Sequence, residues 1–149
     1  MNEKEEFIHY FREVQPKFSR FYTRILANAH LTLPQYALLN QLVSRNAVSM
    51  TKVSNQLHIT KPAVTSLVDR LEKTGFLKRL PHAKDRRVSL LQILPKGEKA
   101  VRKMQAEALN LLLKAFDPLN SAERKIITRF YALISETIDE VLASPKNKK

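Results

Sequence analysis

The stretch that decides the fold is TKPAVTSLVDRLEKTGFLKRLPHAKDRRVSLLQI, residues 60–93. In its first part, apolar residues recur at spacings of three and four, which predicts a helix with one buried face. These residues are Val64, Leu67, Val68 and Leu71. Thr60 is a typical N-cap, Pro62 is tolerated in a first helical turn, and Gly75 suits the position just beyond a helix. We therefore expect a helix that is capped at Thr60 and ends before Gly75.

The second part of this stretch is typical of a β-hairpin with a charged tip. Two strand-like runs, FLKRL at 76–80 and VSLLQIL at 88–94, flank the tip. The ionisable side chains between them are His82, Lys84, Asp85, Arg86 and Arg87. A buried connection does not tolerate so many charges, and a solvated turn does not need them. The tip is therefore predicted to face a charged partner.

Upstream, the sequence predicts two further helices. Pro34 lies in the first turn of a helix in TLPQYALLNQLV, residues 32–43. Ser49 is expected to cap a short helix, MTKVSNQL, which a tight turn at 58–60 joins to the helix after Thr60. Two short helices, a tight turn and a hairpin make a winged helix-turn-helix, which we assign to residues 33–94. The fold class expected for the chain is mainly α (α+β).

Long amphipathic helices flank this lobe. They are expected at residues 3–28 and 96–142, the second with an interruption that is followed by a new cap at Asn120 or Ser121. Their apolar stripes favour pairing between the chains of a symmetric dimer, although both could instead fold back on their own core. Pro16 lies inside the first of them and predicts a kink or a break. We treat all 149 residues as a single domain with N- and C-terminal dimerisation helices.

The chain is strongly basic. It holds 26 Lys and Arg against 14 Asp and Glu, a formal net charge of +12. Such an excess is typical of a protein that meets nucleic acid or an anionic membrane surface, although a merely soluble basic protein is an alternative. Cysteine is absent, which excludes a disulfide framework, a thiol switch and Cys-ligated zinc. The N-terminus does not resemble a signal peptide and no apolar run approaches a membrane span, so we expect a cytoplasmic protein without a membrane partner.

The second helix of a helix-turn-helix usually enters the major groove of double-stranded DNA with its first residues at the base edges. Here the predicted DNA-binding residues of that helix are Thr60, Lys61, Pro62, Thr65, Ser66 and Arg70. The wing adds Lys84, Asp85, Arg86 and Arg87. Arginines at the end of a wing suit the negative potential of a minor groove. Because Asp85 would repel phosphate, we interpret it as a carboxylate that orients a neighbouring guanidinium.

The order of elements and three motifs resemble the MarR (multiple antibiotic resistance regulator) family of bacterial transcription factors. The motifs are VTSLVDRLEKTGFLKR at 64–79, DRR at 85–87 and LPKG at 94–97. The resemblance extends from about residue 7 to residue 142. It implies a homodimer that binds a pseudo-palindromic operator and regulates transcription, as a repressor released by a small effector.

The resemblance also assigns positions within the interface. The family's D-x-R pattern falls on Asp85 and Arg87, which implies that Arg87 enters the minor groove. The base-facing positions of the recognition helix fall on Lys61, Pro62, Thr65 and Ser66. Many members carry Ser or Thr where this chain has KPA, so the half-site sequence stays open.

A small-molecule pocket between the flanking helices and the DNA lobe is a further implication of the resemblance. Its candidate lining residues are Phe18, Phe21, Tyr22, Ile25, His30, Tyr36 and Met104. A small amphipathic or aromatic effector is expected, and phenolic or other amphipathic acids would suit a basic protein. An aromatic stripe at helical spacing is, however, more often plain core. We expect no cofactor, and no metal site because the four histidines are scattered along the sequence.

Other function classes fit less well. An enzyme would need a nucleophile with its base, a metal site or a Gly-rich phosphate loop, and the sequence contains none of these patterns. A nonspecific architectural DNA-binding protein would share the positive charge and is the main alternative. A membrane-surface protein would need a basic helix with a strong apolar face, and the terminal SPKNKK is too short and polar to supply it.

Overall fold

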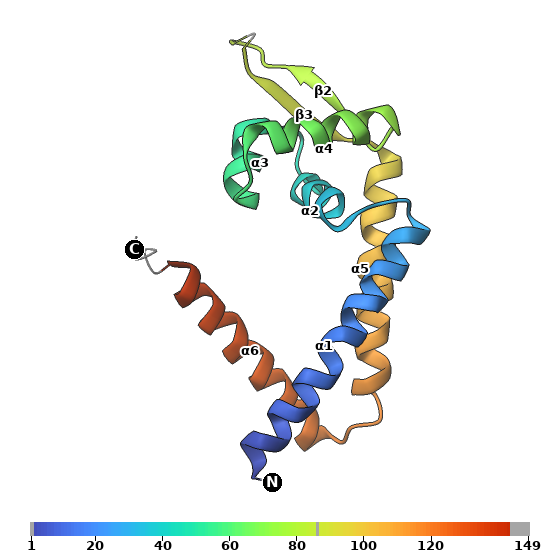
Figure 1. Cartoon of the computed structure of the whole chain (residues 1–149), viewed down its shortest axis with the longest axis vertical. Coiled ribbons are helices and arrows are strands. Elements are labelled where there is room, and N and C mark those ends of the chain that lie inside the picture. Colours follow the sequence, from blue (N-terminus) through green and yellow to red (C-terminus); the bar gives the residue numbers. More distant parts are fainter. Residues whose placement is uncertain (1, 86, 144–149) are drawn as a thin grey trace. The chain divides into compact units, whose positions relative to one another are not determined.

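The computed structural model describes residues 2–85 and 87–143, which are mainly helical with a small antiparallel sheet (Figure 1). The elements in chain order are α1 (Glu3–Asn28), α2 (Leu33–Leu42), β1 (Val48–Ser49), α3 (Met50–Leu57), α4 (Lys61–Lys73), β2 (Leu77–Pro81), β3 (Ser89–Ile93), α5 (Pro95–Phe116) and α6 (Ser121–Ala143). They fall into two compact units, Met1–Ala108 and Leu109–Lys149. The predicted mainly α (α+β) class is confirmed, and the elements of the winged helix-turn-helix all lie in the first unit.

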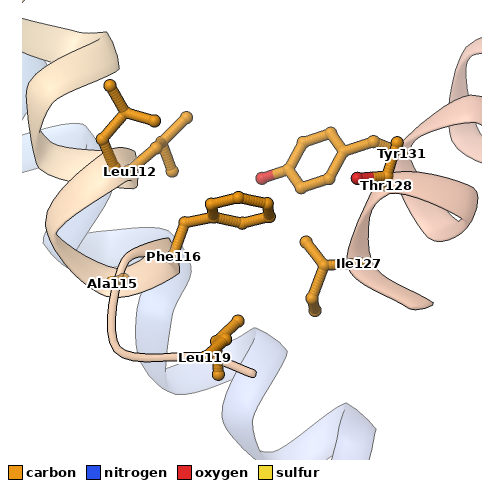
Figure 2. Close-up of a pocket in the computed structure, with 8 residues that line it drawn as sticks. Leu112, Ala115, Phe116, Leu119, Ile127, Thr128 and Tyr131 are labelled. Carbon is orange, nitrogen blue, oxygen red and sulfur yellow. The ribbon is translucent and has the colours of Figure 1, made fainter. Parts of the chain in front are cut away.

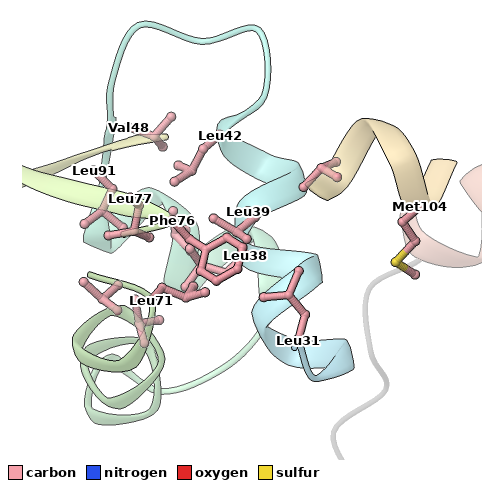
Figure 3. Close-up of a cluster of buried hydrophobic side chains, with 14 of the residues drawn as sticks. Leu31, Leu38, Leu39, Leu42, Val48, Leu71, Phe76, Leu77, Leu91 and Met104 are labelled. Atoms are coloured by element: carbon pink, nitrogen blue, oxygen red, sulfur yellow. The ribbon is translucent and has the colours of Figure 1, made fainter. Parts of the chain in front are cut away.

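An apolar core holds the first unit together, with side chains from α2, α3, α4, the sheet and α5 (Figure 3). Its largest fully buried members are Leu38, Leu39, Leu42, Val53, Val64, Val68, Leu71, Leu77, Leu91 and Val101. The stripe predicted for α4 supplies three of these residues, and its fourth member, Leu67, is half-buried. Full burial of an aliphatic side chain contributes roughly 1.5–3 kcal/mol, so this stripe fixes which face of α4 remains exposed.

The sheet has the order β1-β3-β2, with both pairs antiparallel. Leu91, at the centre of β3, lies opposite Val48 on one side and Arg79 on the other, and it is wholly buried. β1 is a strand of only two residues, too short to show an alternating pattern, so the sequence predicted the hairpin but not this third strand.

The helix ends follow the predicted caps. Ser49 Oγ accepts a hydrogen bond from the Lys52 N–H at 3.2 Å, and Thr60 Oγ1 accepts one from the Ala63 N–H at 3.3 Å. Gly75 follows the end of α4 with φ of +74°, a conformation that glycine adopts without strain. The next backbone N–H, that of Phe76, donates to the Leu71 carbonyl at 2.9 Å. The recognition helix therefore begins and ends where the sequence predicts.

Two expectations about the outer helices are decided by the structure. α1 continues through Pro16 as one helix, so of the predicted kink or break the break is wrong and the kink stays a prediction. Proline removes one backbone donor but has a helical φ, and the turns on either side keep their hydrogen bonds. An ion pair between Lys17 Nζ and Glu13 Oε1, 2.5 Å long, also spans this turn, and its hydrogen bond lowers the pKa of Glu13. Glu13 and Lys17 are both exposed, so this pair adds little stability of its own.

Of the two caps proposed for α6, Asn120 is the one that forms. Its Oδ1 accepts hydrogen bonds from the Ala122 and Glu123 N–H groups at 2.9 and 3.1 Å. The Glu123 carboxylate in turn accepts from the Asn120 N–H at 2.8 Å, which completes a capping box. α6 buries none of its residues. Among the described residues, no helix, α6 included, is both long and apolar enough to cross a membrane.

Gly97 offers a test of how tightly α5 packs on the sheet. A Cβ at this position would lie 2.2 Å from the backbone oxygen of Phe76, so Gly97→Ala must displace the main chain. We expect Gly97→Ala to lower the free energy of unfolding by about 1–3 kcal/mol, measured by denaturant titration at fixed protein concentration. Gly75→Asn is the control, since nothing lies within 4 Å of a Cβ there and Asn tolerates positive φ. Equal losses in the two variants would contradict this packing.

Candidate nucleic-acid interface

The turn between α3 and α4 is held by a buried side chain. Ser54 is 8% exposed, and its Oγ donates to the Ile59 carbonyl at 2.6 Å. His58 occupies the left-handed region with φ of 52°, which reverses the chain after α3. These two residues fix where α4 begins relative to α3. The sequence placed His58 in the predicted turn at 58–60 but did not identify Ser54, because a single serine carries no distinctive spacing.

All six residues predicted to bind DNA from α4 and its cap are exposed. They are Thr60, Lys61, Pro62, Thr65, Ser66 and Arg70. Thr65 Oγ1 donates its proton to the Lys61 carbonyl at 3.0 Å, which leaves its lone pairs and its methyl group turned outward. This side chain is therefore an acceptor and an apolar contact rather than a donor. The exposed face carries small hydrogen-bonding groups together with two positive charges, on Lys61 and Arg70.

A groove of about 230 Å³ joins the first residues of α4 to the wing. It is lined by Met50, Thr51, Lys61, Thr65, Arg87, Val88 and Ser89. Three predicted residues, Lys61, Thr65 and Arg87, thus meet in one concave surface. Met50 and Thr51, from the start of α3, complete the groove and were missed by the sequence reasoning. No motif marked them, since their contribution depends on how α3 packs against the wing.

The wing tip is organised by two side chains that accept hydrogen bonds from the backbone. His82 Nδ1 accepts from the N–H groups of Lys84 and Asp85 at 3.3 and 3.2 Å. Asp85 Oδ1 accepts from the Arg87 N–H at 2.9 Å, and the Asp85 carbonyl accepts from the Val88 N–H at 3.1 Å. Lys84 and Arg87 are exposed at this tip. A tight network of backbone bonds therefore determines where Arg87 leaves the chain.

This geometry shows one bond of Asp85 that the sequence did not predict. Its carboxylate was expected to hold the guanidinium of a neighbouring arginine. In the described structure its Oδ1 accepts from the backbone N–H of Arg87, and no ion pair joins it to the Arg87 guanidinium, so the orienting role stays a prediction. A side chain two residues before an N–H group is well placed for a local Asx-type bond with that group. Arg86, also predicted to bind DNA, lies outside the described residues.

Comparison with known proteins supports one family. The model of the MarR family matches residues 31–89, from two residues before α2 to the first residue of β3. The HTH-type transcriptional regulator MgrA of Staphylococcus aureus is 25% identical over 140 residues, which is 93% of this chain and 94% of MgrA. Over residues 31–89 the chain thus matches the MarR family. As relatives such as MgrA are transcriptional regulators, the expectation of a regulator rather than an enzyme is confirmed.

Solved structures share the fold of this chain. A MarR family protein from Bacillus stearothermophilus superimposes with a TM-score of 0.76 at 23% identity, over 93% of this chain and 99% of that one. A mutant of MepR from S. aureus, solved bound to an oligodeoxyribonucleotide, gives a TM-score of 0.71 at 17% identity, over 89% of this chain and 97% of MepR. At these identities the likeness concerns the fold, which is therefore the winged helix-turn-helix of MarR proteins.

The residues predicted to bind an effector are only partly brought together. A cavity of about 240 Å³ in the first unit is lined by Ser19, Tyr22, Thr23, Leu26, Leu33, Tyr36 and Met104. A second one, of about 30 Å³, contains Ile25 and Met104 and has room for about one water molecule. Phe18, Phe21 and His30 line neither cavity. Phe18 stacks on Tyr22 with ring centroids 6.4 Å apart, and His30 is exposed.

The larger cavity is apolar and uncharged. Burial raises the pKa of Tyr36, and the nearby Tyr22 raises it further, so the Tyr36 hydroxyl stays protonated at neutral pH. No Lys, Arg, Asp or Glu is among its lining residues. The same cavity as the predicted tyrosines is lined by four residues that the sequence did not predict, Ser19, Thr23, Leu26 and Leu33. The wall is thus suited to a ligand that has an apolar body and few hydrogen-bonding groups.

The backbone bond of Asp85 can be tested without DNA. Asp85→Ala removes the acceptor of the Arg87 N–H, whereas Asp85→Asn keeps an acceptor oxygen but removes the charge. A typical hydrogen bond is worth about 0.5–1.5 kcal/mol, so we expect Asp85→Ala to speed exchange of the Arg87 amide by about two- to tenfold. NMR hydrogen-exchange rates measure this effect. Asp85→Asn should change the rate little, and an equal increase in both variants would assign the effect to charge instead.

Proposed function

We propose that this MarR-family protein is a homodimeric, sequence-specific regulator that binds double-stranded DNA at a pseudo-palindromic operator and represses transcription until a small effector releases it. The observation that carries the proposal is the groove in which Lys61, Thr65 and Arg87 converge. It joins the start of a recognition helix to the wing on one exposed surface. The MepR structure with bound oligodeoxyribonucleotide, which shares the fold, supports the same class of ligand.

In this proposal the chain is one functional domain with two roles. Residues 33–94 form the DNA-binding lobe, and residues 3–28 and 96–142 form the dimerisation helices. The lobe is supported by the core that α2, α3, α4 and the sheet share. The flanking helices are supported as dimerisation elements by the apolar residues that they expose.

Contact with the major groove would use the first turns of α4. Thr65 offers hydroxyl lone pairs to a base amino group and its methyl group to a thymine methyl. Ser66 can donate or accept, and Pro62 contributes an apolar surface without a backbone donor. Lys61 suits a phosphate, since an ammonium is a point charge without the fork of a guanidinium. Base identity would then be decided by small groups that let the helix approach closely.

The wing would supply the minor-groove contact. Arg87 is exposed, and its backbone N–H is fixed by Asp85, so its side chain starts from a defined point. The narrow minor groove concentrates negative potential, which favours an inserted guanidinium. Lys84, also exposed, would meet a phosphate beside the groove. The bonds to His82 and Asp85 lower the entropy cost of ordering this tip on DNA.

Dimerisation is supported by the apolar surface of the second unit. A groove of about 440 Å³ lies between the last turns of α5 and the start of α6 (Figure 2). Its lining residues are Leu112, Leu113, Ala115, Phe116, Leu119, Ile127, Thr128 and Tyr131. Further along α6, Ile138, Val141 and Leu142 are 51%, 68% and 72% exposed. A monomeric protein rarely exposes so continuous an apolar surface, so we infer that a second copy covers it.

The effector site would be the larger cavity, with Tyr22, Tyr36 and Met104 as its predicted members. Since no cationic side chain lines it, an uncharged aromatic or amphipathic molecule fits it better than the acids that the net charge of the chain suggests. Release from DNA requires that such a ligand prefer a conformation of the dimer that does not match the operator.

An architectural DNA-binding protein would share the positive charge but would not discriminate between an operator and random DNA. Titration with a selected operator and with random DNA separates the two functions. A specific regulator binds its operator about 10³- to 10⁷-fold more tightly, whereas an architectural protein binds both DNAs alike.

Substitutions in α4 test whether it specifies sequence. We expect Thr65→Ala and Ser66→Ala each to weaken operator binding by about 1–3 kcal/mol while random DNA is affected less, because base contacts specify and phosphate contacts position. Lys61→Ala is the matched comparison. It should weaken binding to every DNA and reduce the salt slope by about 1, measured by fluorescence titration at several salt concentrations. Equal losses on both DNAs for Thr65→Ala would remove that residue from base recognition.

A substitution in α6 tests the dimer. We expect the wild-type chain, 17.2 kDa, to sediment at micromolar concentration as a species of twice that mass. Ile127→Glu places a carboxylate in the apolar groove, at a cost of several kcal/mol in a buried interface, and should shift the equilibrium to monomer. Ala132→Glu adds the same charge on the opposite side of α6 and should leave the dimer intact. A monomeric wild-type chain, or equal dissociation of both variants, would contradict this interface.

A further inference from the structure

Arg79 joins the wing to the recognition helix through two carboxylates. Its Nη2 lies 2.5 Å from Asp69 Oδ1, and its Nη1 forms an ion pair with Glu72 Oε2. Its backbone N–H also donates to Glu72 Oε1 at 3.0 Å. Asp69 and Glu72 lie one turn apart on α4, whereas Arg79 lies on β2. We name this set of three residues the Arg79 clamp.

The clamp holds the wing near its base. Arg79 lies opposite Leu91, the wholly buried residue at the centre of β3, so its strand position is set by the core. Glu72 binds both the backbone and the side chain of Arg79, which restrains the strand as well as the guanidinium. Three residues further on, His82 begins the tip that carries Arg87. A rotation of β2 about its base would therefore move the tip and would have to break the clamp.

The clamp also accounts for two acids on a surface that is otherwise basic. Asp69 lies on the exposed side of α4, where an isolated carboxylate would repel phosphate. The hydrogen bond to Asp69, and then that to Glu72, raise the pKa of Arg79, which means that the carboxylates stabilise its charged form. The side chain of Arg79 is only 29% exposed, whereas Arg87 and Arg70 are exposed residues. The guanidinium of Arg79 is therefore already bound by carboxylates within the protein.

We propose that Arg79 is a positioning residue for DNA recognition, which fixes the distance between the wing tip and the first turn of α4 before DNA binds. This proposal rests on the proposed DNA-binding function. It adds which residue fixes the position of the wing relative to α4. A base contact from Thr65 and a minor-groove contact from Arg87 form together only if this spacing matches the DNA. The rival role is a direct contact of Arg79 with phosphate.

Binding measurements on four single variants and one double variant separate these roles. With Arg79→Gln, we expect operator affinity to fall by about tenfold and random-DNA affinity by less than about threefold, because the loss is one of coupling between two contacts. Arg79→Lys should restore part of the operator affinity, since an ammonium can pair with one carboxylate at a time. Asp69→Asn should weaken operator binding although it removes a negative charge, and it should cost nothing further in the Arg79→Gln background. Arg102→Gln breaks the exposed Arg102–Glu98 pair on α5 and is the matched control, with no expected loss.

The position of the wing is measured directly, and without DNA, by pulsed electron paramagnetic resonance. The chain has no cysteine, so Lys73→Cys and Ala83→Cys introduce spin labels on α4 and on the wing tip alone. Labelled chains diluted with unlabelled chains give distances within one protomer. We expect a narrow distance distribution for the wild-type sequence and a broader one with Arg79→Gln or Asp69→Asn, while circular dichroism reports a folded protein.

Several results would overturn the proposal. They are an unchanged distance distribution with Arg79→Gln, tighter operator binding with Asp69→Asn, or equal losses on both DNAs with a shallower salt dependence for Arg79→Gln, as a phosphate contact would give. If the wild-type chain does not discriminate operator from random DNA, the proposed function fails instead. The distance measurement still decides whether the clamp holds the wing.

Discussion

The close approach at Phe76 is the constraint on which the first unit depends. The recognition helix ends just before Gly75, β2 begins two residues after Gly75, and α5 starts against the same backbone. The Phe76 carbonyl accepts from the Leu94 N–H at 3.0 Å, and only the missing side chain of Gly97 allows α5 to come so near. Lys96 adds a bond from its Nζ to the Thr74 carbonyl, at 2.7 Å, and lies over the Phe76 ring at 4.6 Å from its centroid. The end of α4, the start of the wing and the start of α5 thus all meet at Phe76.

Elements that local chemistry dictates were predictable from the sequence. α4 was found by its apolar spacing, its cap at Thr60 and its terminating Gly75, and the hairpin by two strand-like runs around a charged tip. β1 was not predictable, because two residues show no period and their pairing with β3 is decided by the tertiary fold. Pro16 misled for the opposite reason. Its local preference is real, but the rest of a long helix outweighs the loss of one donor.

In the candidate interface, too, the features set by the local sequence were predictable, and those set by the tertiary fold were not. Exposure of Thr65 and Ser66 follows from the helical period once the buried stripe is known. The partners of charged residues do not follow, because they depend on which elements meet in space. Asp85 binds a backbone N–H, and Arg79, a basic residue of the hairpin, pairs with Asp69 and Glu72. A count of basic residues therefore overstates the charge that this surface presents to DNA.

Ser49 belongs to two elements at once, since it pairs with Leu90 in the sheet and caps α3. The strand of the wing that returns to the core is therefore tied to α3, while the outgoing strand is tied to α4. The number of residues is consequently restricted between α3 and α4 but not at the wing tip. An extra residue between α3 and α4 would pull the two strands out of register with their helices. Extra residues at the wing tip would disturb neither helix, so a longer or shorter wing is the change that this architecture can accept most readily.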